Sequence, residues 1–148
     1  MRQALQILVG VGLVVVAASC ATIRPPSSTP DTSKKMVVTG YCKCRDCCGW
    51  DRNWLGRPVF TSGPNKGKYK QVGQTANGSM ADHGTLAADT ALYPFGTIMY
   101  IEGYGYGRVE DTGGRVKGQH IDLYFHSHRG ANEWGKQMVV VEVWYPKK

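Results

Sequence analysis

The chain has 148 residues, and Lys and Arg outnumber Asp and Glu by 18 to 11, which gives a formal net charge of +7. A chain of this length holds one small domain, and no internal repeat or second domain is apparent. One interpretation of the positive charge is that it only confers solubility, because Lys66, Lys68 and Lys70 lie in a polar loop whose one interleaved aromatic residue is Tyr69. Net charge alone identifies no partner.

Residues 1–19 are typical of an export signal, with one positive charge at Arg2, an apolar run from Ile7 to Ala18 and small residues before Cys20. The apolar run is too short to span a bilayer. Since the segment resembles the lipobox of bacterial lipoproteins, we predict lipidation of Cys20 and anchoring in the bacterial cell envelope. In a Gram-negative organism this would be the periplasmic side of the outer membrane. The alternative is ordinary signal cleavage that leaves Cys20 unmodified.

Residues 20–35 are rich in Pro, Ser and Thr and contain almost no apolar side chains. Such a composition cannot bury enough surface to offset the entropy of ordering. We predict a disordered tether here, followed by one folded domain over residues 36–148. In an exported protein, the excess positive charge favours cell-wall polymers or lipid head groups as partners.

Four cysteines, Cys42, Cys44, Cys47 and Cys48, lie within seven residues directly after the first predicted strand. In an oxidising compartment such thiols normally form disulfides. Because adjacent cysteines do not bond each other without strain, Cys42 and Cys44 are each expected to join one of the other two. The alternative is a zinc or other soft-metal site that includes a histidine.

Residues 49–84 are dense in Gly, Asn, Pro and Lys and are predicted to form a long loop. Long loops on a compact scaffold are often binding surfaces. Trp50, Trp54 and Tyr69 are candidates for stacking on sugar rings, and the alternative for each is that it covers a small core.

Six short runs rich in β-forming residues are separated by Gly and Pro turns. They cover residues 36–41, 85–89, 97–101, 107–111, 120–125 and 138–144, and residues 128–135 are the one predicted helix. Short strands at even spacing with little helix are typical of a small closed β-barrel, so the predicted class is all-β.

Three aspartates, Asp89, Asp111 and Asp122, lie in or at the ends of these strands, beside glycine turns. Carboxylates in such positions can converge on one cleft, and we predict that these three do. In residues 120–125, alternation places Ile121, Leu123 and Phe125 toward the core. His120, Asp122 and Tyr124 then share the opposite face.

The run KGQHIDLY at residues 117–124, together with the three aspartates, makes residues 85–144 resemble the three-aspartate (3D) domain. The segment is also similar to the C-terminal part of the membrane-bound lytic transglycosylase A family, whose corresponding pattern is DxGGAIKGQHFDIY. Arg115 replaces the usual small residue after the double glycine. The family's larger second domain has no counterpart in this sequence, so a different substrate groove is expected.

The resemblance implies a six-stranded double-psi β-barrel, a fold shared with family 45 endoglucanases and expansins. It further implies that Asp122 is the catalytic acid and that Asp111 and Asp89 support it by raising its pKa. The implied reaction is lytic cleavage of the MurNAc–GlcNAc bond of peptidoglycan, which leaves a 1,6-anhydro-MurNAc end. The predicted substrate-binding residues are Tyr124, His120, Thr112, Gly113 and Lys117.

Three alternatives remain open from the sequence. One is a hydrolytic glycosidase with Asp111 or Asp46 as base. Another is an expansin-like module that binds wall glycan without cutting it. The last is an aspartic protease, because residues 111–113 read Asp-Thr-Gly, although Glu110 stands where such proteases have an apolar residue.

The expected partners are peptidoglycan glycan strands and, through Cys20, a membrane. We expect no nucleic-acid partner and a monomeric protein. His126 and His128 are alternate residues that can share a face toward a metal, but solvated histidines are the commoner case. We therefore predict no cofactor and no metal requirement for activity.

Overall fold

A computed structural model of the protein describes residues 22–147. The predicted signal at residues 1–19 and the predicted lipidation site Cys20 lie outside the described residues. Over the described range, no helix combines the length and apolar character that a membrane crossing requires.

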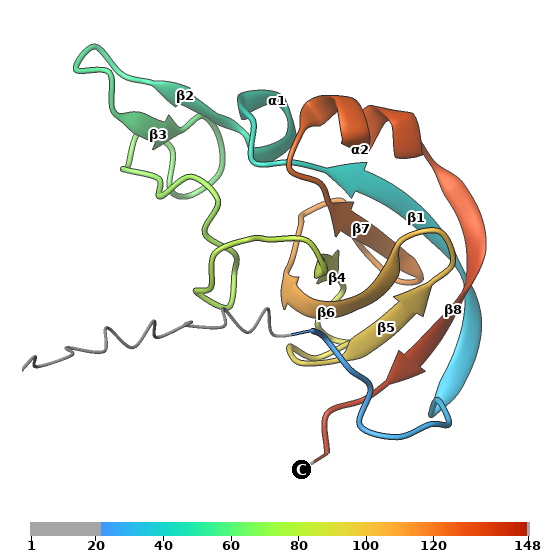
Figure 1. The fold of residues 1–148 in the computed structure, drawn as a ribbon. Coiled ribbons are helices and arrows are strands. Elements are labelled where there is room, and N and C mark those ends of the chain that lie inside the picture. The colour runs from blue at the N-terminus through green and yellow to red at the C-terminus, as the bar shows by residue number, and fades with distance from the viewer. Residues whose placement is uncertain (1–21, 148) are drawn as a thin grey trace, which may run out of the picture.

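Six strands close into a barrel in the order β1-β7-β4-β6-β5-β8 (Figure 1). Strand β1 pairs in parallel with β7, as β4 does with β6, and the other neighbours are antiparallel. The predicted all-β class and closed six-stranded barrel are confirmed. The barrel strands are β1 (Thr32–Tyr41), β4 (Thr85–Ala88), β5 (Ile98–Ile101), β6 (Gly105–Asp111), β7 (His120–Tyr124) and β8 (Gln137–Trp144).

The predicted helix is α2 (His128–Trp134), and it lies against β1. Its N-terminus is capped by Ser127, whose Oγ accepts a hydrogen bond from the Gly130 N–H at 3.1 Å. A second, four-residue helix that the sequence did not predict, α1 (Arg45–Cys48), lies within the run of cysteines. Gly49 ends it at φ +54°, a left-handed conformation that favours glycine.

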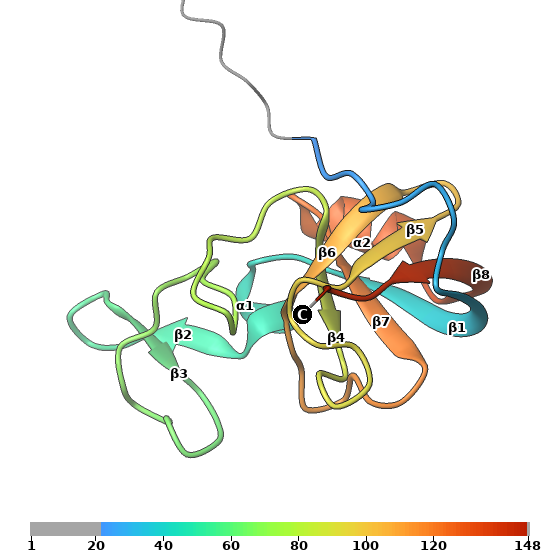
Figure 2. The ribbon, with the colours of Figure 1, turned by 90° about the horizontal axis from the view of Figure 1, so that it is seen from below.

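Strands β2 (Trp50–Arg52) and β3 (Pro58–Phe60) form a separate antiparallel pair inside the segment predicted as loop. The loop prediction is therefore wrong for these residues. We call residues 50–60 the hairpin arm. Figures 1 and 2 both show the arm projecting from the barrel on the side of α1.

The barrel interior holds the main hydrophobic core, built from alternate residues of the six strands. On β7, Ile121 and Leu123 are fully buried in this core and Phe125 packs against it, as the alternation predicted. A smaller cluster of Tyr41, Ala87 and Tyr124 lies apart from this core. One strand face therefore supports the fold, and the opposite face is available for chemistry.

The N-terminal boundary of the barrel lies earlier than predicted. Residues 32–35, assigned above to the disordered tether, belong to β1, because Thr32 to Lys35 pair with β8. The preceding turn also contacts the barrel, since Trp144 Nε1 donates to the Thr29 carbonyl at 2.9 Å. Backbone partners on β8 order a segment whose side chains offer little apolar surface.

At Gly40, the backbone of β1 lies close to α2. A Cβ at this position would lie 2.9 Å from the Ala131 carbonyl oxygen and 3.0 Å from Phe125 Cε2. We expect Gly40→Ala to lower the free energy of unfolding by about 1–3 kcal/mol through overpacking, measured by urea denaturation. Gly114→Ala is the control, since nothing lies within 4 Å of its Cβ position. Equal denaturation midpoints for the two variants would contradict this packing.

Candidate active site

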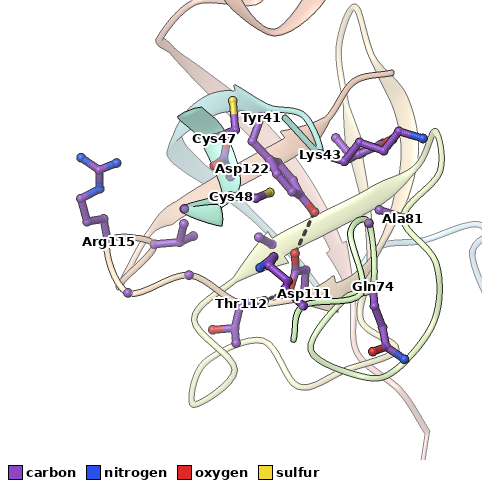
Figure 3. Close-up of a pocket in the computed structure, with 18 of the residues that line it drawn as sticks. Tyr41, Lys43, Cys47, Cys48, Gln74, Ala81, Asp111, Thr112, Arg115 and Asp122 are labelled. Atoms are coloured by element: carbon purple, nitrogen blue, oxygen red, sulfur yellow. Dashed lines mark hydrogen bonds between the residues drawn. The ribbon is translucent and has the colours of Figure 1, made fainter. Parts of the chain in front are cut away.

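A pocket of about 460 Å³ lies between the ends of β6 and β7, the segment that carries the cysteines, and the base of the hairpin arm (Figure 3). Asp111 and Asp122, from β6 and β7, line it together with Asp46 of α1. We call it the carboxylate pocket. Its other charged and aromatic lining residues are Tyr41, Lys43, Phe60, Lys70, Arg115 and Tyr124.

Asp122 is held on the outward face of β7, partly shielded from solvent. Burial is the largest influence and raises the pKa of Asp122 above its ordinary value. A hydrogen bond from Thr39 and the charge of His120 act in the opposite direction, while Asp111 raises the pKa further. Asp122 is therefore suited to holding a proton that it can donate.

Asp111, at the end of β6, accepts three hydrogen bonds. The Tyr41 hydroxyl donates to Oδ2 at 3.0 Å, and the backbone N–H groups of Ala76 and Thr112 donate to Oδ1 at 3.0 and 2.9 Å. Burial, and secondly the nearby Asp111, raise the pKa of Tyr41, so its hydroxyl keeps its proton. These donors fix the orientation of the Asp111 carboxylate.

Thr39 links Asp122 to His120. The Thr39 Oγ1 lies 3.0 Å from Asp122 Oδ1 and 2.8 Å from His120 Nε2, and His120 Nδ1 lies 3.3 Å from the Arg115 carbonyl oxygen. A hydroxyl has one proton, so Thr39 donates either to Asp122 or to His120. When Thr39 donates to an ionised Asp122, His120 must supply the proton between Nε2 and Thr39. The hydrogen-bond direction therefore depends on the charge of Asp122.

Asp89 does not line the carboxylate pocket, although the sequence predicted that all three aspartates converge. Its carboxylate accepts hydrogen bonds from the N–H groups of Gly118 at 3.0 Å and Ala91 at 3.2 Å. These bonds, the Gly118 bond first, lower the pKa of Asp89. Asp89 thus holds the turn that leads into β7, and the structure brings only Asp111 and Asp122 together.

The predicted substrate-binding residues divide in the same way. Tyr124, Thr112 and Gly113 line the carboxylate pocket. His120 lies behind Asp122 and reaches it through Thr39. Lys117 is exposed and is not among the lining residues.

Several residues of the site were not predicted. Tyr41 and Thr39 come from β1, which pairs in parallel register with β7, Tyr41 opposite Tyr124 and Thr39 opposite Asp122. Lys43 and Lys70 come from segments without a regular pattern. In the sequence, only the alternation along β1 could have indicated Thr39 and Tyr41, because it places both side chains on the same face.

The predicted disulfides are not present in the structure, because Cys42, Cys44, Cys47 and Cys48 are all free thiols. Cys42 Sγ lies 3.8 Å from Cys47 Sγ, and the sulfur atoms of Cys42, Cys44 and Cys47 surround His128 Nδ1. Cys48 points elsewhere, with its thiol 3.2 Å from the Cys42 carbonyl oxygen, and lines the carboxylate pocket.

Together the fold and site define a small closed β-barrel domain with a shielded acid beside a second carboxylate. Residues 84–146 match the family model described as the 3D domain. The match confirms the resemblance to the 3D domain that the sequence predicted.

Two curated proteins of Bacillus subtilis (strain 168) are similar to the chain. One, "Cell wall-binding protein YocH", is 41% identical over 58 residues, which is 39% of this chain and 20% of that protein. The other, "Putative cell wall shaping protein YabE", is 33% identical over 116 residues, 78% of this chain and 24% of that protein. The chain thus matches a quarter or less of the length of either relative.

Solved structures of E. coli MltA are also similar to the chain. The complex with chitohexaose has a TM-score of 0.39 and 22% identity, over 49% of this chain and 28% of that one. The other MltA structure has a TM-score of 0.40 and 21% identity, over 53% and 28% of the two chains.

Two substitutions are expected to move the pKa of Asp122 in opposite directions. Thr39→Val removes a hydrogen bond that favours the ionised carboxylate, so the pKa should rise further. Asp111→Asn removes the neighbouring negative charge, so the pKa should fall. Titration of the carboxyl carbon resonances by NMR measures both shifts.

Thr112→Val is the control for these titrations, because the backbone N–H of Thr112, rather than its hydroxyl, bonds Asp111. It should leave the titration of Asp122 unchanged. A pKa that falls in Thr39→Val would show that Thr39 does not stabilise the ionised form.

Proposed function

We propose that the domain cleaves glycosidic bonds of peptidoglycan, with Asp122 as the acid and then the base of a lytic transglycosylase reaction. The observation that carries the proposal is the placement of Asp122, a shielded carboxyl group of raised pKa, beside Asp111 in one pocket. The 3D-domain match and the relatives described as cell wall-binding and cell wall-shaping proteins support the substrate class.

The reaction needs one acid–base group. Protonated Asp122 donates its proton to the glycosidic oxygen as the bond to the MurNAc anomeric carbon breaks. The 6-hydroxyl of the same MurNAc then attacks that carbon and gives its proton to Asp122, which restores the acid and leaves a 1,6-anhydro ring. Asp111, with its orientation fixed, stabilises the positive charge that develops on the sugar.

The Thr39 and His120 hydrogen bonds fit this cycle. When Asp122 has given up its proton, Thr39 donates to the carboxylate and His120 donates to Thr39. The ionised intermediate is therefore stabilised by side chains already in place, without rearrangement of the backbone.

Cations at the pocket match an anionic polymer. Lys43, Lys70 and Arg115 line the pocket around the two carboxylates, and Lys70 Nζ also lies 4.3 Å from the centroid of the Phe60 ring. Peptidoglycan carries carboxylates on its stem peptides. These three side chains are proposed to attract the polymer while Asp122 remains available to the glycan.

A second hollow of about 410 Å³ extends the site along the base of the hairpin arm. It shares Phe60, Lys70, Gln74 and Asp111 with the carboxylate pocket and adds Tyr69, whose side chain is 65% exposed. We propose that this combined groove holds successive sugars and that Tyr69 stacks on one of them. Phe60 at the end of the arm and the loop that follows it would then form one wall of the groove.

Binding without cleavage is the second candidate, because one relative is described as a cell wall-binding protein. Hydrolysis is the third candidate, because Asp111 and Asp46, the two bases considered from the sequence, both line the carboxylate pocket.

We also propose lipid anchoring through Cys20, which would place the domain at the cell envelope. Fatty-acid labelling of the unchanged chain and of Cys20→Ser tests this proposal.

We expect Asp122→Asn to lower the release of anhydromuropeptides from purified sacculi by about 10²–10⁴-fold, because an amide cannot transfer the proton. Products are identified by mass. Asp51→Asn, on the exposed hairpin arm beside Arg45, is the matched control and should keep the rate. Unchanged release by Asp122→Asn would exclude Asp122 as the acid.

The masses also separate the alternatives. Products that contain an added water indicate a hydrolase, and binding to sacculi without soluble products indicates a binding module.

Unfolding curves of Asp122→Asn at neutral pH check that this variant still folds. The free energy of unfolding of Asp122→Asn should equal or exceed that of the unchanged protein. The substitution removes a carboxylate whose ionised form is destabilised by burial.

Tyr69→Ala is expected to weaken co-sedimentation with sacculi several-fold, because it removes the aromatic face of the second hollow. Trp54→Ala is the control. Trp54 is 90% exposed on the hairpin arm and lines neither hollow, so its loss should leave binding unchanged. Equal binding by both variants would remove Tyr69 from the groove.

A further inference from the structure

The strongest unassigned feature outside the carboxylate pair is a group of four side chains, Cys42, Cys44, Cys47 and His128, which we call the Cys₃His group. Their three sulfur atoms and the His128 ring nitrogen all lie within 4.8 Å of one another. We infer that the Cys₃His group binds one Zn²⁺ ion that fixes the wall of the carboxylate pocket.

The distances fit tetrahedral coordination. With Zn–S near 2.3 Å and Zn–N near 2.0–2.1 Å, tetrahedral angles separate two sulfur ligands by about 3.8 Å and a sulfur from a nitrogen by about 3.6 Å. Cys42 Sγ and Cys47 Sγ are 3.8 Å apart. His128 Nδ1 lies 3.4 Å from Cys44 Sγ, 3.5 Å from Cys47 Sγ and 4.0 Å from Cys42 Sγ.

The backbone explains how three cysteines reach one point. Cys42 follows β1 directly, and Cys44 and Cys47 flank the first turn of α1 with the two-residue spacing common in zinc sites. Cys44 is the N-cap residue of α1, yet its side chain makes no capping hydrogen bond. The thiol is instead directed to the other ligands.

The fourth ligand comes from far along the chain. His128 is the first residue of α2, which packs on β1. A disulfide would use two thiols and would give no role to a ring nitrogen placed among three sulfurs. Three thiolates and one imidazole are instead a ligand set that zinc prefers, and four protein ligands leave no open position for catalytic water. The ion is therefore structural, and it corresponds to the soft-metal alternative that the sequence left open for these cysteines.

The position of the group links it to the site. Tyr41, which bonds Asp111, immediately precedes Cys42 in the chain. Cys47 itself, together with Cys48 and Gly49, lines the carboxylate pocket. A metal that joins the end of β1, α1 and the start of α2 would hold this wall in place, where the described chain has only a small apolar cluster.

The test is the metal content of the full chain, purified with a non-thiol reductant and measured by elemental mass spectrometry. We expect one zinc per chain, and loss of that zinc in Cys44→Ser and in His128→Ala. Cys48→Ser and His126→Ala are the matched controls and should retain it, because Cys48 bonds the Cys42 carbonyl and His126 pairs with Asp82.

Substitution with Co²⁺ provides a second readout that does not depend on a variant's stability. The unchanged chain should show the intense visible absorption of tetrahedral cobalt and a sulfur-to-cobalt charge-transfer band. His128→Cys should still bind one metal and show a stronger charge-transfer band, because it adds a fourth thiolate. Zinc that persists in both Cys44→Ser and His128→Ala overturns the proposal. Alkylation that finds these thiols paired in disulfides overturns it too.

The link to the pocket wall rests on the proposed function, but the metal measurements use no substrate. A chain that binds zinc and cuts no glycan would refute the catalytic role of Asp122 and leave the metal site standing. A chain that cuts glycan but binds no zinc would refute the metal site and leave the catalytic role of Asp122 standing.

Discussion

The parallel pairing of β1 with β7 is the constraint on which the site depends. It sets Thr39 opposite Asp122 and Tyr41 opposite Tyr124. The same register therefore supplies the donor to the acid, through Thr39, and the donor to the second carboxylate, through Tyr41. Because side chains alternate along a strand, a shift of one residue would turn both donors toward the barrel core.

Shielding Asp122 has a cost in stability that depends on pH. Its folded-state pKa is raised, mainly by burial, so the folded protein holds this proton more tightly than the unfolded chain does. Below the unfolded pKa both states are protonated, and the group contributes no penalty. As the pH rises through the folded pKa, the buried carboxylate ionises, and this destabilises the folded protein relative to the unfolded chain. The barrel core on the other face of β7, with Ile121 and Leu123 fully buried, offsets that cost.

The two sides of the carboxylate pocket are built differently. One side is barrel strand, rigid because its alternate residues fill the core. The other side consists of α1, the hairpin arm and the following loop, whose described residues bury few apolar side chains. Direct hydrogen bonds such as that from Ala76 to Asp111, and the proposed zinc, take the place of a second hydrophobic core. The cysteines near the site thus have a structural use that is separate from the chemistry of the acid.

The sequence by itself determined the approximate positions of the six barrel strands, the all-β barrel, helix α2 and the face on which Asp122 lies, because these follow from local alternation, turn residues and a specific motif. It did not determine which chemical groups meet. Asp89 was separated from Asp111 and Asp122 by its bonds to a neighbouring turn, and Thr39 joined Asp122 from 83 positions away. Cys42, Cys44 and Cys47 were brought together around His128 rather than paired in disulfides. These outcomes depend on strand register and on the packing of α2 against β1, which are long-range contacts that no local pattern encodes.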